Sequence, residues 1–223
     1  VHNPEMFQPH FGIDESGKGD YFGPLVIAGA YTDSESTRAL MEAGVMDSKR
    51  VSSRDRIVNL SGIIRRTQGV KVSVIMVGPK RYNELYERFA NLNELLAWGH
   101  AKVIKELSEL VPGCPRALSD QFANPRVLER ALARQEVNVK LEQRTKGESD
   151  VAVAAASILA REAFVRWIEN ASETWGLALP LGAGAPVLAS GREFIALHGR
   201  ERLAEIAKFH FKTTNQLTRT ENE

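Results

Sequence analysis

Two adjacent carboxylates, Asp14 and Glu15, lie inside a glycine-rich segment near the start of the 223-residue chain. The segment from Gly12 to Lys18 fits the phosphate-binding loop pattern G-x-x-x-x-G-K-[ST], except that Gly19 takes the place of the final hydroxyl residue. Such a loop needs that hydroxyl for Mg²⁺, and it holds phosphate with backbone amides that must not face anionic side chains. The pattern therefore argues against a nucleotide hydrolase.

The same two carboxylates are suited to binding a metal ion. Neighbouring residues on a strand point to opposite faces, so both side chains can serve one site only where the strand bends or ends. Ser16 and Gly17 would supply such an end. Mg²⁺ typically takes one or two carboxylates together with phosphate oxygens and water. For this dipeptide alone, a solvated acidic turn stays open as the alternative.

Two further acids occupy equivalent places in the chain. Asp120 follows a short predicted strand, and Glu148 follows another and directly precedes an apolar helix. Open α/β sheets build their sites at such strand ends. Four converging acids would raise one another's pKa values, and two divalent cations would offset their charge. This arrangement is typical of two-metal phosphodiester hydrolysis.

Strands and helices that alternate along the chain would position these acids. Apolar runs and period-2 alternation predict strands, and three- and four-residue apolar spacing predicts helices. The predicted strands cover residues 25–31, 70–77, 116–119 and 137–142, and the helices 35–43, 53–66, 92–111 and 151–170. Residues 176–191 are predicted as a loop, followed by a helix capped at Ser190-Gly-Arg-Glu193. We expect an α/β fold with a mixed central β-sheet flanked by helices and a helical C-terminal part.

The overall composition narrows the class of protein. The chain is 43% hydrophobic and 26% charged, as in an ordinary globular domain, and its net charge is +1, so affinity for polyanions requires a local patch. Cys114 is the only cysteine, which excludes an internal disulfide and a multi-thiolate zinc site. No apolar run reaches about 18 residues, and no secretion signal opens the chain. We expect a cytoplasmic protein without membrane contact.

The segment from Gly12 to Leu25, Gly-Ile-Asp-Glu-Ser-Gly-Lys-Gly-Asp-Tyr-Phe-Gly-Pro-Leu, closely resembles the signature of ribonuclease HIII. This family is a branch of the type 2 ribonuclease H enzymes, which cut the RNA strand of RNA–DNA hybrids. The resemblance extends to about Thr214. It continues through Asp47-Ser-Lys49, Asn93-Glu-Leu-Leu-Ala97 with His100, Ser119-Asp-Gln-Phe122, Lys146-Gly-Glu148, Ala154-Ala-Ala-Ser-Ile-Leu-Ala-Arg161 and Lys208-Phe-His-Phe-Lys-Thr-Thr214.

The resemblance implies a ribonuclease H-like fold and an endonuclease that depends on two Mg²⁺ or Mn²⁺ ions and leaves 3′-hydroxyl and 5′-phosphate ends. Asp14, Glu15, Asp120 and Glu148 match the family's four catalytic, metal-binding acids. Ribonuclease HII usually has aspartate at the fourth position, so Glu148 is similar to the HIII pattern.

The resemblance also implies residues that contact the RNA–DNA hybrid. Ser16 and the Gly17-Lys18-Gly19 segment match the part of the family that tracks the minor groove and touches ribose 2′-hydroxyls. Glycine lets the backbone approach a sugar directly, and the 2′-hydroxyl distinguishes RNA from DNA. Lys18 can pair with a phosphate. Ser48 and Lys49 resemble a segment near the nucleic-acid backbone, with an ordinary surface loop as the equal alternative.

Two further positions are interpreted from their residue types. His100 falls on the predicted long helix, where a histidine is more often structural or solvated than catalytic. Lys208, His210 and Lys212 form a small basic cluster that either touches phosphates or makes a solvated C-terminal face.

We expect residues 1–11 to be a lead or linker remnant, residues 12–214 to form the catalytic domain with its helical C-terminal segment, and residues 215–223 to be a flexible tail. Ribonuclease HIII proteins typically carry an N-terminal substrate-binding domain, for which residues 1–11 are too short. A hybrid-binding module with weak or no activity is therefore the alternative function. Ribonuclease HII enzymes use a tyrosine to sense an RNA–DNA junction, and residues 163–200 contain none. We therefore predict a preference for several consecutive ribonucleotides, and a monomeric protein.

Overall fold

The computed structural model describes residues 4–46, 53–120, 122–144 and 147–218. The chain divides into two compact units, each made of three segments. The first unit comprises Val1–Glu15, Ile27–Ile75 and Asn91–Glu162, and the second comprises Ser16–Val26, Met76–Ala90 and Ala163–Glu223. Because these segments alternate along the chain, neither unit is a contiguous domain.

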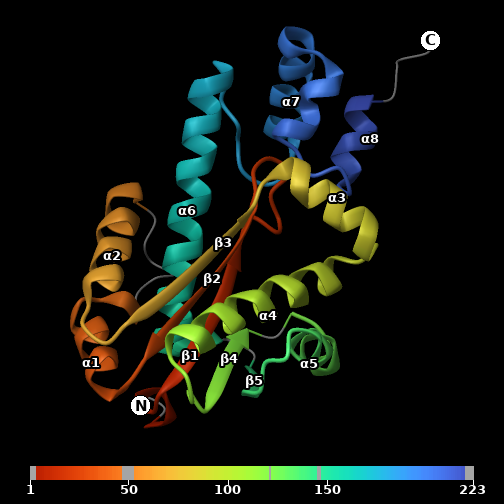
Figure 1. Ribbon diagram of the computed structural model, residues 1–223. Coiled ribbons are helices and arrows are strands. Elements are labelled where there is room, and N and C mark those ends of the chain that lie inside the picture. The colour runs from red at the N-terminus through yellow and green to blue at the C-terminus, as the bar shows by residue number, and fades with distance from the viewer. Residues whose placement is uncertain (1–3, 47–52, 121, 145–146, 219–223) are drawn as a thin grey trace. The chain divides into compact units, whose positions relative to one another are not determined.

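A five-stranded sheet is the framework on which the acids of the first unit are arranged (Figure 1). The strands are β1 (His10–Ser16), β2 (Leu25–Thr32), β3 (Lys71–Val77), β4 (Arg116–Asp120) and β5 (Lys140–Arg144). Their order is β3-β2-β1-β4-β5, so β1 lies at the centre. β1 pairs in parallel with β4, and β4 pairs in parallel with β5. The predicted fold class, a mixed sheet flanked by helices with a helical C-terminal part, is confirmed.

Helices account for most of the remaining described residues. The α-helices are α1 (Ser34–Glu42), α2 (Arg54–Arg66), α3 (Pro79–Phe89), α4 (Leu92–Leu110), α5 (Pro125–Arg134), α6 (Val151–Trp175), α7 (Ala185–His198) and α8 (Lys212–Thr218). The short 3₁₀ helices are η1 (Pro4–Phe7), η3 (Gly147–Ser149) and η4 (Arg200–Glu205). The tail expected from residue 215 thus begins inside α8, and residues 219–223 lie outside the described part.

Two of the predicted elements are misplaced. Residues 176–191 were expected to form a loop, but α7 begins at Ala185, with Gly184 as its N-cap and Pro186 in the first turn. Ser190, expected to cap a helix, lies buried inside α7, and its hydroxyl donates to the Ala178 carbonyl at 2.6 Å. The strand expected over residues 137–142 begins at Lys140, because pairing with Arg116 of β4 sets its start.

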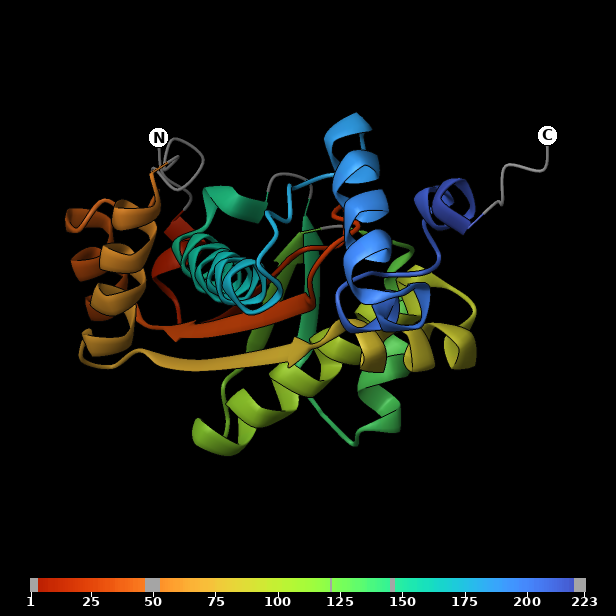
Figure 2. The ribbon, with the colours of Figure 1, turned by 90° about the horizontal axis from the view of Figure 1, so that it is seen from above.

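Helices pack on both faces of the sheet close to β1, with α4 on one face and the first part of α6 on the other (Figure 2). Gly12 allows α6 to approach, since a Cβ there would overlap the backbone of Ala152 and Val153. On the opposite face, a Cβ on Gly29 would lie 2.6 Å from Val103 of α4. β1 and β2 therefore each carry a glycine where a helix packs closely against the sheet.

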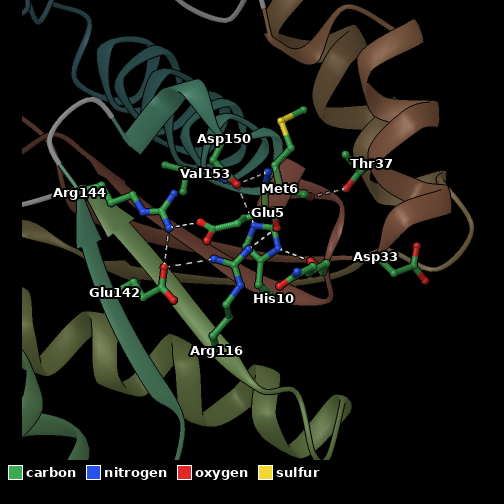
Figure 3. A network of polar contacts seen from close by, with 12 residues as sticks. Glu5, Met6, His10, Asp33, Thr37, Arg116, Glu142, Arg144, Asp150 and Val153 are labelled. Atoms are coloured by element: carbon green, nitrogen blue, oxygen red, sulfur yellow. Dashed lines mark hydrogen bonds and ion pairs between the residues drawn. The ribbon is translucent and has the colours of Figure 1, made fainter. Parts of the chain in front are cut away.

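A buried histidine ties the start of β1 to the start of α6 (Figure 3). His10 is completely buried, and its Nε2 lies 2.9 and 3.0 Å from the two carboxylate oxygens of Asp150. Asp150 also accepts hydrogen bonds from the amides of Ala152 and Val153, as an N-cap does. One carboxylate thus orients both the central strand and the helix beside it.

An arginine network next to this pair joins β4, β5 and η1 (Figure 3). Arg116 donates to Glu142 at 3.3 Å and to the carbonyl of Glu5. Arg144 contacts Glu142 at 2.8 Å and Glu5 at 2.5 Å. Glu142 of β5 thus accepts from an arginine of each strand, and both arginines contact Glu5 of η1.

The second unit contains α3, η4, α7 and α8. The rings of Trp175 and Phe194 lie 5.0 Å apart, and the Arg202 guanidinium lies 4.3 Å above the Trp175 ring.

Within the described part of the chain, no helix combines the length and the apolar character needed to cross a membrane.

Candidate metal and nucleic-acid site

Asp14 and Glu15 lie in the last three residues of β1 and point to opposite faces of the sheet. The Asp14 carboxylate accepts a hydrogen bond from Ser157 of α6 and from the Glu15 amide, the latter at 2.8 Å. The Glu15 carboxylate lies 3.0 Å from Nε2 of His100 in α4. The strand position of these acids excludes the phosphate-loop interpretation, because residues 12–16 form a strand and the turn after them leads into β2 rather than a helix.

The electrostatic environment of Asp14 disfavours its charged form. Burial and the neighbouring Glu15 carboxylate together raise the pKa of Asp14 to about 6. The Ser157 hydroxyl, the Glu15 amide and His100 oppose this shift without cancelling it. Negative charge is therefore crowded at this end of β1, as expected where a cation completes the site.

Asp120 lies beside Asp14 through the pairing of the strands. The registered pair Ile13 and Ser119 directly precedes the two aspartates on parallel neighbours. Paired residues on neighbouring strands are about 5 Å apart, and residues one step further along follow the same register. The two aspartates thus leave the same edge of the sheet.

The segment that carries Glu148 is fixed to Asp120. The Gly147 amide donates to Oδ1 of Asp120 at 3.1 Å, and a Cβ on Gly147 would lie 3.1 Å from the Asp120 amide nitrogen. Glu148 itself occupies the middle of η3, after β5 and before α6. Its backbone therefore lies next to the end of β4. Its place after a strand and directly before a helix agrees with the prediction from the sequence.

The chemistry of these residues fits a hard divalent cation. Carboxylate oxygens are the ligands that Mg²⁺ and Mn²⁺ prefer, and Asp14, Glu15 and Asp120 carry such oxygens at two adjacent strand ends. Among the side chains that the structure describes, a set that does not include the side chain of Glu148, no group of three or more potential ligands is close enough to hold an ion.

The Gly17-Lys18-Gly19 segment follows Ser16, the last residue of β1. Gly17 has φ +88° and is buried, and a Cβ there would overlap the Pro24 carbonyl and lie 2.8 Å from the Phe164 ring. Gly19 is exposed, and a Cβ there would meet no protein atom within 4 Å. The fold thus requires glycine at position 17 but imposes no such requirement at position 19. Lys18, between the two glycines, is also exposed.

Two other predictions from the sequence concern Ser48 with Lys49, and Lys208. Ser48 and Lys49 fall outside the described residues. Lys208, expected on a basic phosphate-binding or solvated face, is instead completely buried, with its Nζ on the backbone carbonyls of Phe22 and Gly23.

His100 is the site residue whose contact could not be anticipated from the sequence. It is completely buried, so the solvated interpretation is wrong. Because an ionised carboxylate only accepts, Nε2 of His100 carries the hydrogen donated to Glu15. Its Nδ1 has no hydrogen-bond partner in the described part of the chain, and its ring lies 4.8 Å from that of Phe122.

The ribonuclease HII family, as described by its sequence model, matches residues 11–214. A ribonuclease HIII from Chlamydia pneumoniae is 47% identical over 212 residues, which cover 94% of this chain and 70% of the relative. One from Protochlamydia amoebophila is 44% identical over 209 residues, covering 94% of this chain and 68% of the relative. The chain therefore belongs to the ribonuclease HII family of ribonucleases, and within it to ribonuclease HIII.

Solved structures agree with this assignment. The crystal structure of Bst-RNase HIII in complex with Mn²⁺ is similar with a TM-score of 0.87 at 31% identity, over 95% of this chain and 69% of that one. RNase HII from Archaeoglobus fulgidus, solved as a complex with PCNA, is similar with a TM-score of 0.78 at 29% identity, over 96% of this chain and 98% of that one.

Proposed function

We propose that this protein hydrolyses the RNA strand of RNA–DNA hybrids at an active site formed by Asp14, Glu15, Asp120 and Glu148. The products would be a 5′-phosphate and a 3′-hydroxyl. The observation that carries the proposal is the register of β1 and β4, which brings Asp14 and Asp120 to the same sheet edge, with the Glu148 segment hydrogen-bonded to Asp120.

The four acids would hold two divalent ions, Mg²⁺ or Mn²⁺. When bound, such ions activate a water and stabilise the leaving oxygen of the phosphodiester. The Mn²⁺ complex of Bst-RNase HIII supports a divalent ion at this fold. The protein's own part is to orient the carboxylates: Ser157 and the Glu15 amide hold Asp14, His100 holds Glu15, and the Gly147 amide holds Asp120.

The Gly17-Lys18-Gly19 segment would recognise the RNA strand, with Ser16 at its start. Gly19 is exposed and leaves its surroundings open, so the backbone there can approach a ribose 2′-hydroxyl without a side chain between. Lys18, exposed next to it, is suited to a phosphate contact. Ser48 and Lys49 remain proposed backbone contacts by resemblance alone.

The test is cleavage of a labelled RNA–DNA hybrid in Mg²⁺ and in Mn²⁺, by the parent and by Asp14→Asn. This substitution keeps the shape of the side chain and removes one charge that holds metal. We expect the parent to cut only the RNA strand and the variant to be inactive. Hybrid binding without cleavage in either ion would instead favour the alternative, a hybrid-binding module.

Substrate choice is a second part of the proposal. Residues 163–200 contain no tyrosine that could sense an RNA–DNA junction. We expect faster cleavage of a hybrid with several consecutive ribonucleotides than of a duplex with one embedded ribonucleotide. Equal rates on the two substrates would refute this preference.

A further inference from the structure

Lys208 is completely buried, although lysine is almost never fully buried without a partner. Its Nζ donates to the carbonyl of Gly23 at 2.5 Å and to that of Phe22 at 3.3 Å. The Tyr82 ring covers it, with its centroid 5.7 Å from Nζ. Burial of a lysine amino group is unfavourable unless hydrogen bonds compensate it. The amino group of Lys208 therefore depends on these two carbonyls as acceptors, and the carbonyls depend on it as their donor.

Both carbonyls belong to the turn between β1 and β2, residues 17–24, which we call the substrate loop because it contains Gly17-Lys18-Gly19. The backbone next to Lys208 pairs with the same loop. Phe22 and Ala207 form an antiparallel bridge, and the Gly23 amide donates to Ile206 at 2.8 Å. The Lys208 amide donates to the Tyr21 carbonyl at 2.9 Å. Lys208 and the two residues before it thus hold three consecutive loop residues, from Tyr21 to Gly23.

The segment that carries Lys208 is itself anchored by Asn83 of α3. The Asn83 side chain donates to the Ala207 carbonyl at 3.0 Å and accepts from the Phe209 amide at 2.9 Å. This pair of bonds flanks Lys208 on both sides. The lysine is therefore presented to the loop from a fixed backbone.

The earlier part of the loop has an anchor of a different kind. Asp20 accepts a hydrogen bond from the Gly182 amide at 2.7 Å, and the Tyr21 amide donates to the Gly182 carbonyl at 2.8 Å. Position 182 precedes α7, so this anchor is independent of the segment around Lys208. The loop is consequently held at Asp20 by one segment and at Phe22 and Gly23 by another.

We propose that Lys208 is a positioning residue for the substrate loop: it holds the loop in the form in which the backbone around Gly19 contacts the RNA strand. Lys208 cannot touch substrate, because it has no exposed surface. Its removal would leave two carbonyls without a donor and weaken the contact to RNA, while the carboxylates of β1 and β4 keep their own hydrogen bonds. This inference rests on the proposed function.

The test compares Lys208→Met, which keeps the length of the side chain and removes the donor, with Lys80→Met on the exposed surface of α3. We expect Lys208→Met to raise KM for the hybrid by about tenfold, as a displaced positioning group does, with a much smaller change in kcat. Hydrogen exchange, followed by mass spectrometry, should accelerate at the Gly23 amide, which donates to the segment that carries Lys208. Lys80→Met should match the parent in both measurements.

Unchanged KM in folded Lys208→Met overturns the positioning role, whether or not exchange accelerates. If Lys208→Met does not fold, Asn83→Ala takes its place, because it releases the segment around Lys208 without removing the ammonium. Asn83→Ala must then raise both KM and exchange, and parental values would overturn the inference. A parent that does not cleave the hybrid refutes the proposed function itself, and exchange in the variants then still tests whether Lys208 holds the loop.

Discussion

Alanine substitutions at three glycines separate what the fold requires from what the substrate requires. At Gly17, alanine would adopt φ +88° and its Cβ would overlap the Pro24 carbonyl and approach Phe164. A left-handed conformation costs about 1–2 kcal/mol, and overpacking costs about 1–3 kcal/mol. We therefore expect Gly17→Ala to lower the free energy of unfolding by roughly 3 kcal/mol, which is a fall in Tm of about 10 °C for a chain of this size.

Gly113 and Gly19 are the matched controls. Gly113 has φ +81° but no protein atom within 4 Å of an added Cβ, so Gly113→Ala should show the conformational cost alone, about 1–2 kcal/mol. Gly19 has neither a left-handed φ nor a close neighbour, so Gly19→Ala should change stability by less than about 0.5 kcal/mol.

Hybrid binding should distinguish the two controls in a way that stability does not, since only Gly19 is proposed to contact the RNA strand. A methyl group on Gly19 would stand between the backbone and the ribose, so we expect roughly tenfold weaker hybrid binding, equivalent to about 1.4 kcal/mol. Gly113→Ala should bind as the parent does. Thermal melting and fluorescence anisotropy with a labelled hybrid measure the two quantities. The reasoning fails if Gly17→Ala melts like Gly19→Ala, or if Gly19→Ala binds the hybrid with parental affinity.

Three further predictions follow from the buried polar contacts. His100→Leu removes the donor to Glu15 and should weaken Mn²⁺ binding, measured by calorimetry, by about 10–100-fold. His100→Gln can place an amide near the position of Nε2 and should therefore recover part of the Mn²⁺ affinity. Equal losses of affinity in the two variants would contradict a donor role for His100. Asp150→Ala removes the cap of α6 and the hydrogen-bond partner of buried His10. Urea unfolding should therefore show a free energy of unfolding that is lower by about 2–4 kcal/mol. Glu173→Ala, in the last turn of α6, is the control and should leave this free energy nearly unchanged. Burial lowers the pKa of Lys208 to about 7, against partial opposition from Asp20, so the unfolded chain binds more protons than the folded one between pH 7 and 10.5. The stability of the parent relative to Lys208→Met should therefore rise with pH across this window, and a constant or falling difference would contradict a pKa lowered by burial.

The elements predicted correctly are those whose local pattern matches their environment. The apolar run over residues 25–31 is buried on both faces as β2, and the three- and four-residue spacing from Leu92 gives α4. The glycine and proline content of residues 176–191 predicts a loop, but Gly184 and Pro186 begin α7, because proline is well tolerated in the first turn of a helix. The alternation over residues 137–142 predicts a strand, but only residues 140–142 lie in β5, because the start of the strand depends on pairing with β4, which is not a local property.

The same distinction applies to the site. The adjacency of Asp14 and Glu15, and the strand before Asp120, predict acids at strand ends, and these three residues do lie in the last part of β1 and at the end of β4. His100 and Glu15 are 85 residues apart, and Lys208 and Phe22 are 186 apart. Contacts between residues so distant in sequence leave no periodic pattern, and a lysine in a polar C-terminal segment gives no sign that it is buried.

The long sequence separation between Lys208 and the loop that it holds affects how the protein folds during translation. At about 5–20 residues per second, 186 residues correspond to roughly 10–40 s of translation. Throughout that interval the nascent chain carries the carboxylates of β1, but the adjoining loop lacks the ammonium group that anchors it. The substrate loop would thus acquire this anchor only after Lys208 has been synthesised and has reached the loop.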